Sequence, residues 1–156
     1  MTRQKIKTCL WFDGDAQEAA EFYASVFKDR DNSGITDITP GPNGAALVVA
    51  FRLAGVEFLA LNGGPHFRFN EAISLSVDCR SQEELDELWE RLSAGGSPGR
   101  CGWLKDRYGL SWQLVPAIPP RLLAGADRGR VQRVTDALMG MTKLDIRALE
   151  AAAEVA

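Results

Sequence analysis

Two side chains in this sequence, His66 and Cys101, are of types that often carry out chemistry near neutral pH. His66 is the single histidine, and an imidazole with its usual pKa of about 6.5 can donate or accept a proton. It lies in the run GGPHFRF with no partner fixed by the sequence, so we favour an ordinary loop histidine. Cys101 lies between Arg100 and Lys105, whose charges could lower a thiol pKa and create a nucleophile. No histidine is near it in sequence, and a small buried thiol is the interpretation that we favour.

Three further side chains are candidates for contact with a ligand. Gln113 leads them, because an amide between Trp112 and Leu114 needs a hydrogen-bond partner if it is enclosed. A purely structural role for this amide stays open. Trp103 lies outside the regular alternation of its segment and could line a pocket, whereas the other tryptophans are expected in the core. Glu71 could act as a base or be a solvated carboxylate at a strand edge.

The strands and helices of the chain must position these candidate residues, and the first half is expected to supply one set of them. Hydrophobic periodicity predicts strands at residues 5–12, 35–38, 46–53 and 56–62, and a helix at residues 16–28. Asp15 is the expected N-cap of that helix, with Glu18 three residues later as in a capping box. Ala54-Gly55 is typical of a two-residue hairpin turn between the last two strands.

The second half repeats this order. A strand is expected at residues 73–79, a helix between Ser81 and Gly95, and a closing hairpin from 101–106 to 110–116. A βαβββ unit cannot bury its own sheet face alone. The repeat therefore predicts an α+β fold, in which two βαβββ modules form curved mixed sheets around a shared cleft.

The expected boundaries follow from this repeat. Residues 1–120 form one domain, with module one at about 1–64 and module two at about 65–120. Residues 121–156 form a C-terminal helical extension, because two runs within them carry helical spacing. Their apolar side chains must cover either their own sheet or a partner subunit, and both options stay open.

Composition excludes several classes of function. Eighteen Lys and Arg against 21 Asp and Glu give a net charge of −3, so we expect no nucleic-acid partner. No apolar stretch reaches the roughly 18 residues that span a bilayer, so no membrane association is expected. The three cysteines are widely separated, and the start of the chain lacks a signal-peptide core. A reducing cytoplasm is therefore the expected location.

Several long motifs resemble a known family. They are CLWFDGDAQEAAEFYASVF, FNEAISLSVDCRSQEELDELWERLSAGG, CGWLKDRYGLSWQLVP and ALMGMTKLDIRALEAA. The chain resembles the PhnB-like branch of the vicinal oxygen chelate superfamily, also called the glyoxalase/bleomycin-resistance fold. Members of this branch often carry the label 3-demethylubiquinone-9 3-methyltransferase domain. The resemblance implies paired βαβββ modules, assembled as a homodimer, and agrees with the repeat.

The superfamily's enzymes hold a divalent metal through His, Gln or Glu side chains on the cleft faces of strands. The resemblance places three of these positions at Thr8, at Ala72 beside Glu71, and at Gln113. A divalent cation needs three or more good oxygen or nitrogen ligands, which this set does not supply. We therefore expect no metal. We also expect no S-adenosylmethionine or other cofactor, because the first strand ends in Asp13-Gly14-Asp15 and not in a G-x-G turn.

Strand alternation assigns side chains to this cleft. If Ala72, Ser74 and Ser76 face it, then Ile73, Leu75 and Val77 pack under the helix. In the closing strand, Ser111 and Gln113 face the cleft while Trp112 and Leu114 are core. In the first strand, Thr8, Leu10 and Phe12 are expected to point into it. Such a mixed apolar and hydroxyl lining suits a neutral or weakly polar small molecule.

Three hypotheses about function remain open. The first is a metal-free protein that binds a small organic molecule in a dimeric cleft, with Gln113, Ser74, Thr8, Trp103, Glu71 and Phe12 as ligand contacts. The second is an enzyme that uses the same cleft on an aromatic or quinone-like substrate, through Gln113, Glu71, Ser74 or His66. The third is a metal-dependent lyase or dioxygenase. Whether the protein is an enzyme is left undecided.

Overall fold

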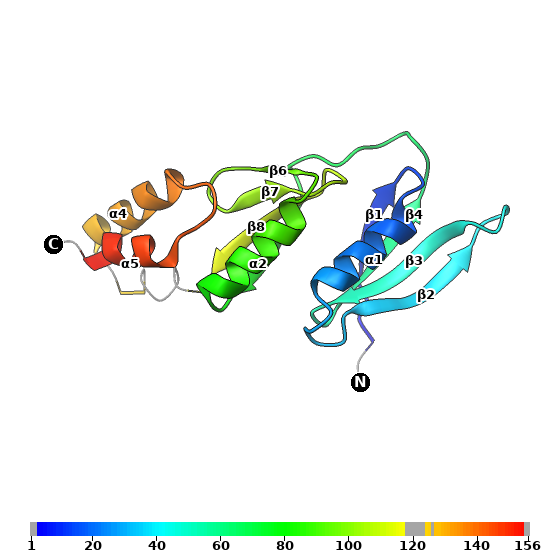
Figure 1. Cartoon of the computed structure of the whole chain (residues 1–156), viewed down its shortest axis with the longest axis horizontal. Helices are drawn as coiled ribbons and strands as arrows, with labels where there is room; N and C mark the ends of the chain where they lie inside the picture. Colours follow the sequence, from blue (N-terminus) through cyan, green and yellow to red (C-terminus); the bar gives the residue numbers. More distant parts are fainter. Residues whose placement is uncertain (1–2, 118–123, 126, 155–156) are drawn as a thin grey trace. The chain divides into compact units, whose positions relative to one another are not determined.

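The structure is a computed structural model that describes residues 3–117, 124–125 and 127–154. The chain divides into two compact units, residues 1–69 and 70–156, each with one four-stranded sheet (Figure 1). Both sheets are mixed, and the element order confirms the predicted α+β repeat. No helix in the described part of the chain is long and apolar enough to cross a membrane.

The first unit holds five elements. They are β1 (Thr8–Phe12), α1 (Ala16–Val26), β2 (Gly34–Pro40), β3 (Ala46–Leu53) and β4 (Val56–Asn62). The strand order is β1-β4-β3-β2, with β1 parallel to β4 and the other pairs antiparallel. The β3–β4 turn forms at Ala54-Gly55 as predicted, since both residues adopt positive φ, 45° and 83°.

Helix α1 packs on this sheet through small and aromatic side chains. Ala16, Ala19, Ala20, Tyr23 and Val26 are buried, and the Tyr23 ring stacks on Phe51 of β3 at 6.2 Å between centroids. Asp15 is the N-cap residue as predicted, but its side chain makes no capping hydrogen bond. Instead, the Ala16 N–H donates to Asn62 Oδ1 at 2.9 Å, so the end of β4 satisfies the helix start.

The second unit repeats the arrangement. Its elements are β5 (Ser74–Cys79), α2 (Gln82–Ser93), β6 (Ser97–Pro98), β7 (Trp103–Lys105) and β8 (Ser111–Pro116), in the sheet order β5-β8-β7-β6. Ser81 caps α2 as predicted, because its hydroxyl accepts from the Glu84 N–H at 3.1 Å. The Glu84 carboxylate accepts from the Arg80 N–H at 2.7 Å. The two-residue β6 was missed by sequence reasoning, because a strand this short has no measurable alternation.

The C-terminal helices pack on their own chain, which answers a question that the sequence left open. They are α4 (Arg128–Met139) and α5 (Ile146–Glu154). Val134 of α4 and Leu149 of α5 are buried, as is Leu144 in the segment that joins the helices. Arg133 of α4 donates to the Ala152 carbonyl near the end of α5 at 3.1 Å. The helix pair is therefore part of the second unit.

Candidate functional site

The sheet of the second unit has two chemically different faces. Trp112 and Leu114 of β8 pair with Leu75 and Val77 of β5, and both β8 side chains are almost fully buried. Helix α2 covers this side with Leu85, Leu88 and Leu92, as its position over the sheet in Figure 1 shows. Because side chains alternate along a strand, the residues between them point to the opposite side.

We call that opposite side the polar face, and define it by Ser74, Ser76, Trp103, Lys105, Ser111 and Gln113. Gln113 Nε2 donates to Ser74 Oγ at 2.9 Å, linking β8 to β5. Trp103 of β7 lies beside Gln113 in register. The predicted alternation is confirmed within β5 and β8, but the predicted packing of Ile73 under the helix is wrong, because Ile73 precedes β5 and is 66% exposed. The structure brings Gln113, Ser74 and Trp103 together. This bond uses one donor of the Gln113 amide and one acceptor site of the Ser74 hydroxyl, so part of the hydrogen-bonding capacity of both side chains is already satisfied.

A hollow of about 340 Å³ opens at the β7 edge of the polar face. Its lining includes Glu71, Ser97, Arg100, Trp103, Lys105 and Ser111. Two of the predicted ligand contacts, Trp103 and Glu71, are among them. The charges of Arg100, Lys105 and Glu71 make the hollow more polar than the neutral lining that the sequence suggested.

Ser111 carries the least satisfied polar group in the hollow. Its side chain is only 1% exposed, and its Oγ has no hydrogen-bond partner among the described residues. A buried hydroxyl without a partner costs about 1–3 kcal/mol, so such groups are rare in folded proteins. Because this Oγ is almost inaccessible, a molecule in the hollow can supply the missing partner only if a neighbouring side chain moves aside.

Glu71 is held in its ionised form by a neighbouring cation, which makes it a weak proton acceptor. Its carboxylate forms an ion pair with Lys105, and both side chains are substantially exposed. The hydrogen bond from Lys105 is the main cause that lowers the Glu71 pKa, followed by a backbone hydrogen bond and the Lys105 charge. A lowered pKa makes a carboxylate a weaker base. The arrangement therefore favours a role in orienting Lys105 over the general-base role considered from sequence.

The predicted facing of the first strand is wrong. Phe12 is only 4% exposed, and β1 pairs with β4 so that Thr8 and Phe12 lie beside Phe58 and Asn62. Phe58 is buried in the core, and Asn62 binds the start of α1, so this is the face that the helix covers. Thr8 and Phe12 therefore do not belong to the open side of their sheet. Cys9 and Trp11 alternate with them along β1 and therefore lie on the open side of the sheet.

The three positions aligned with metal ligands supply too few donors for a divalent cation. Thr8 offers one neutral hydroxyl, Ala72 has no donor side chain, and Gln113 donates its amide to Ser74. Within the ranges that the structure describes, no three His, Cys, Asp or Glu side chains cluster as a metal site would require. These neutral donors do not fit a divalent cation, which needs several oxygen or nitrogen ligands.

Sequence reasoning missed the residue that organises the turn before β8. Asp106 is 2% exposed, and its carboxylate accepts from the Tyr108 N–H at 2.8 Å, the Leu110 N–H at 3.1 Å and Trp112 Nε1 at 2.9 Å. The carboxylate thus fixes how β7 returns into β8, and with it the relative positions of Lys105 and Ser111. An aspartate before an R-Y-G turn was visible in the sequence, but the indole that it binds was not.

Two βαβββ modules with mixed sheets define the glyoxalase fold class. Within that class, the family model for 3-demethylubiquinone-9 3-methyltransferase matches residues 4–115, and the chain belongs to this family. The match ends before α4, so the C-terminal helices lie outside it.

Solved structures of similar proteins support the assignment. The PhnB protein from Bacillus cereus is 36% identical, covering 73% of this chain and 100% of that one, with a TM-score of 0.67. Protein PA1353 from Pseudomonas aeruginosa is 18% identical over 73% of this chain and 98% of its own, with a TM-score of 0.60. The fosfomycin resistance protein FosX from Listeria monocytogenes, complexed with Mn(II) and sulfate, is 20% identical over 78% of this chain and 99% of its own, with a TM-score of 0.54. The last two show the fold alone. No curated protein matches the chain.

Proposed function

We propose that this protein binds a small organic acid, without a metal, in the hollow on the polar face of its second unit. The observation that carries this proposal is the lining of the hollow, which includes Ser111 with a buried hydroxyl that has no hydrogen-bond partner among the described residues. The volume of the hollow, about 340 Å³, is at the lower end of ligand pockets, which span roughly 300–1,000 Å³. The ligand is therefore a small molecule.

The charges of the lining favour an anionic group on the ligand. Arg100 and Lys105 contribute two positive charges and Glu71 one negative charge. A guanidinium matches the geometry of a carboxylate, which also accepts readily from a serine hydroxyl. Trp103 offers an apolar surface for a flat ligand body. An aromatic carboxylate combines these features, and this replaces the neutral ligand expected from the sequence.

Catalysis is the second hypothesis, and no described residue of the hollow favours it strongly. The ion pair with Lys105 lowers the Glu71 pKa and so weakens the best candidate base. Mass spectrometry of an aromatic or quinone-like compound before and after incubation with the protein tests this hypothesis. A changed mass would establish an enzyme, and elemental analysis of the purified protein for Zn, Ni, Fe and Mn tests the metal-dependent alternative.

A binding titration tests the proposal directly. Benzoate should quench or shift tryptophan fluorescence saturably, with a Kd of about 1 mM, which corresponds to about 4 kcal/mol for so small a ligand. Benzamide has the same shape without the charge and should bind more weakly. Arg100→Ala should weaken benzoate binding about fivefold through loss of a charge-assisted hydrogen bond. Arg80→Ala, an exposed arginine outside the hollow, is the matched control. Equal binding of benzoate and benzamide would contradict the proposal.

A further inference from the structure

We infer that the C-terminal extension is a positioning element for the hollow, although it lies outside the residues that the family model matches. The inference rests on the proposed function, since it assigns the extension a role in binding at the same hollow. The element responsible is the segment Met141–Asp145, which joins α4 to α5. It contacts the loop at residues 99–102, and this loop forms one wall of the hollow.

Backbone hydrogen bonds connect the two segments. The Cys101 N–H donates to the Met141 carbonyl at 2.8 Å, and the Gly102 N–H donates to the Thr142 carbonyl at 2.8 Å. On the opposite side, the Gly102 carbonyl accepts from the Leu114 N–H at 2.9 Å. The loop is therefore held between β8 and the extension.

The held loop leads directly into the lining of the hollow. Gly99 and Arg100 come just before Cys101, and Trp103 comes just after Gly102. The turn is closed by the Trp103 N–H, which donates to the Arg100 carbonyl at 3.0 Å. A displacement of Cys101 and Gly102 would therefore move the two side chains that we assign to the ligand's charge and flat body.

The loop backbone needs support from outside. Cys101 has a φ of +57°, which is costly for a residue with a side chain and persists only where surrounding contacts enforce it. Gly102 has a φ of +83°, and a Cβ there would lie 3.1 Å from Leu144 Cγ. Leu144 thus packs closely against the loop, and its side chain is 1% exposed. The extension supplies both the carbonyl acceptors and the apolar contact.

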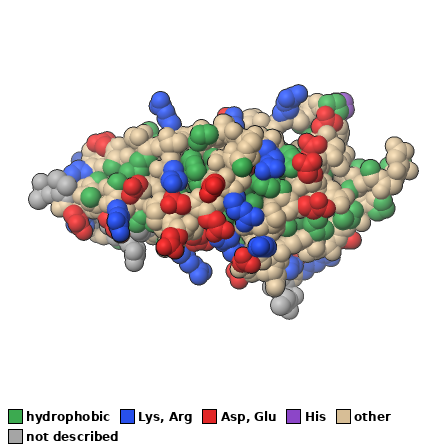
Figure 2. Space-filling model, in the orientation of Figure 1, with side chains coloured by type: hydrophobic (Ala, Val, Ile, Leu, Met, Phe, Trp, Pro, Cys, Tyr) green, Lys and Arg blue, Asp and Glu red, His purple; other side chains and the backbone are tan. Residues whose placement is uncertain are grey.

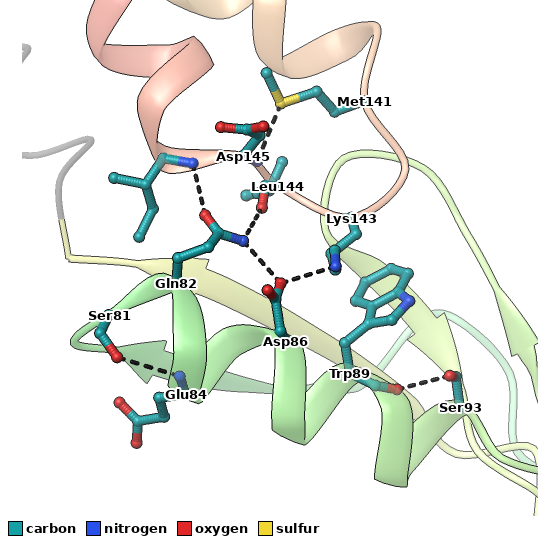
Figure 3. A network of polar contacts seen from close by, with 11 residues as sticks. Ser81, Gln82, Glu84, Asp86, Trp89, Ser93, Met141, Lys143, Leu144 and Asp145 are labelled. Atoms are coloured by element: carbon teal, nitrogen blue, oxygen red, sulfur yellow. Dashed lines mark hydrogen bonds and ion pairs between the residues drawn. The ribbon is translucent and has the colours of Figure 1, made fainter.

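Helix α2 anchors the segment in turn, as Figure 3 shows. Gln82 Nε2 donates to the Leu144 carbonyl at 3.1 Å, while Gln82 Oε1 accepts from the Ile146 N–H at 2.9 Å. Lys143 forms an ion pair with Asp86 of α2 at 2.8 Å. These bonds fix the segment on both sides of Leu144, so that the loop rests on α2 through the extension.

A leucine truncation tests this role. Leu144→Ala removes the side chain against Gly102, and Gln82→Ala removes the amide bonds without touching the hollow. Both variants should weaken benzoate binding about fivefold or more, because Arg100 and Trp103 lose their fixed positions. Leu53→Ala makes the same truncation at a buried leucine of β3, outside the second unit, and should leave the affinity close to that of the wild type.

Cys101 provides a second readout that does not depend on a ligand. Its Sγ lies 3.6 Å from Met139 Sδ on α4, so loss of docking should expose it. In a Cys9→Ser background, a disulfide reagent should react with Cys101 about tenfold faster in Leu144→Ala, as expected for greater local opening.

The two readouts separate the possible failures. Faster thiol reaction with unchanged benzoate affinity would overturn the inference and leave the proposed function standing. Unchanged thiol reactivity in both Leu144→Ala and Gln82→Ala would also overturn it, because the extension would not hold the loop. If the wild-type protein binds no benzoate, the proposed function fails, and with it the role of the extension in binding.

Discussion

At the scale of single residues, Ser111 distinguishes a binding site from an ordinary part of the sheet. Ser111→Ala removes a buried hydroxyl that has no hydrogen-bond partner in the described part of the chain, so the free energy of unfolding should stay unchanged or rise by up to about 1 kcal/mol. Benzoate affinity should fall about threefold or more, through loss of one hydrogen bond. Urea unfolding and the fluorescence titration measure the two effects. Ser76→Ala, on the same face but outside the hollow, should change neither. A less stable Ser111→Ala with unaltered affinity would assign the hydroxyl to the fold.

Asp106, unlike Ser111, is expected to stabilise the fold, because its described hydrogen bonds all join parts of the β7–β8 hairpin. Asp106→Ala leaves the Leu110 N–H and Trp112 Nε1 without their buried acceptor. Losing both should lower the free energy of unfolding by about 3 kcal/mol, measured by urea denaturation. Asp78→Ala removes an exposed carboxylate from β5 and should cost less than about 0.5 kcal/mol. Equal stability of the two variants would contradict the turn-organising role of Asp106.

At the scale of elements, the contact between α2 and the extension should depend on pH. The hydrogen bond from Lys143 is the main cause that lowers the Asp86 pKa, and a hydrogen bond from Gln82 adds to it. Because the folded pKa is lowered, this stabilisation is present above the unfolded aspartate pKa of about 3.9 and is lost as pH falls through the lowered value. The Asp86 and Lys143 side chains are 46% and 42% exposed, so solvent screens the ion pair and its contribution to the free energy of unfolding should be below about 1 kcal/mol.

Asp86→Asn tests this dependence, since it keeps an oxygen for Gln82 but removes the charge. The variant should be less stable than the wild type at pH 7, and the difference should be smaller at pH 3, below the unfolded pKa of about 3.9. Urea unfolding at the two pH values measures it. An equal difference at pH 3 and pH 7 would show that packing, and not the ion pair with Lys143, stabilises this contact.

The elements also show how far the sequence could predict the site. The faces of β5 were predicted correctly from Ser74 onward, because serines alternate with Leu75 and Val77, but the alternation was extended too far, to the exposed Ile73. In β1 both parities are apolar, Leu10 and Phe12 on one side and Cys9 and Trp11 on the other, so alternation alone could not choose. Pairing with β4 decides the face, and that is a contact between residues about fifty positions apart. The docking of the extension likewise depends on Gln82 meeting Ile146, which no local pattern reveals.

At the scale of the whole molecule, the charge distribution agrees with a small ligand more than with a polyanion. Lys and Arg side chains are interspersed with Asp and Glu over the face shown in Figure 2, and the net charge is −3.

The proposed homodimer now rests on different residues. Leu144 and Leu149, whose apolar character suggested a partner, are buried on their own chain. Exposed apolar side chains remain at Ile38, Val56 and Met139. Light scattering should give about 34 kDa at micromolar concentration, twice the chain mass of 17.0 kDa. A mass of 17.0 kDa would contradict the dimer without affecting binding within one unit.

The central claim is that a small organic acid binds in the hollow beside Ser111. The most direct test is a benzoate titration of the isotopically labelled protein, followed through its backbone amide NMR signals. We expect saturable shifts concentrated at residues 97–105 and 111–113, which contain most of the lining and the first half of β8, where Ser111 lies. In Ser111→Ala the same signals should move with a weaker apparent affinity. Saturable shifts confined to other residues, or none at all, would contradict the claim.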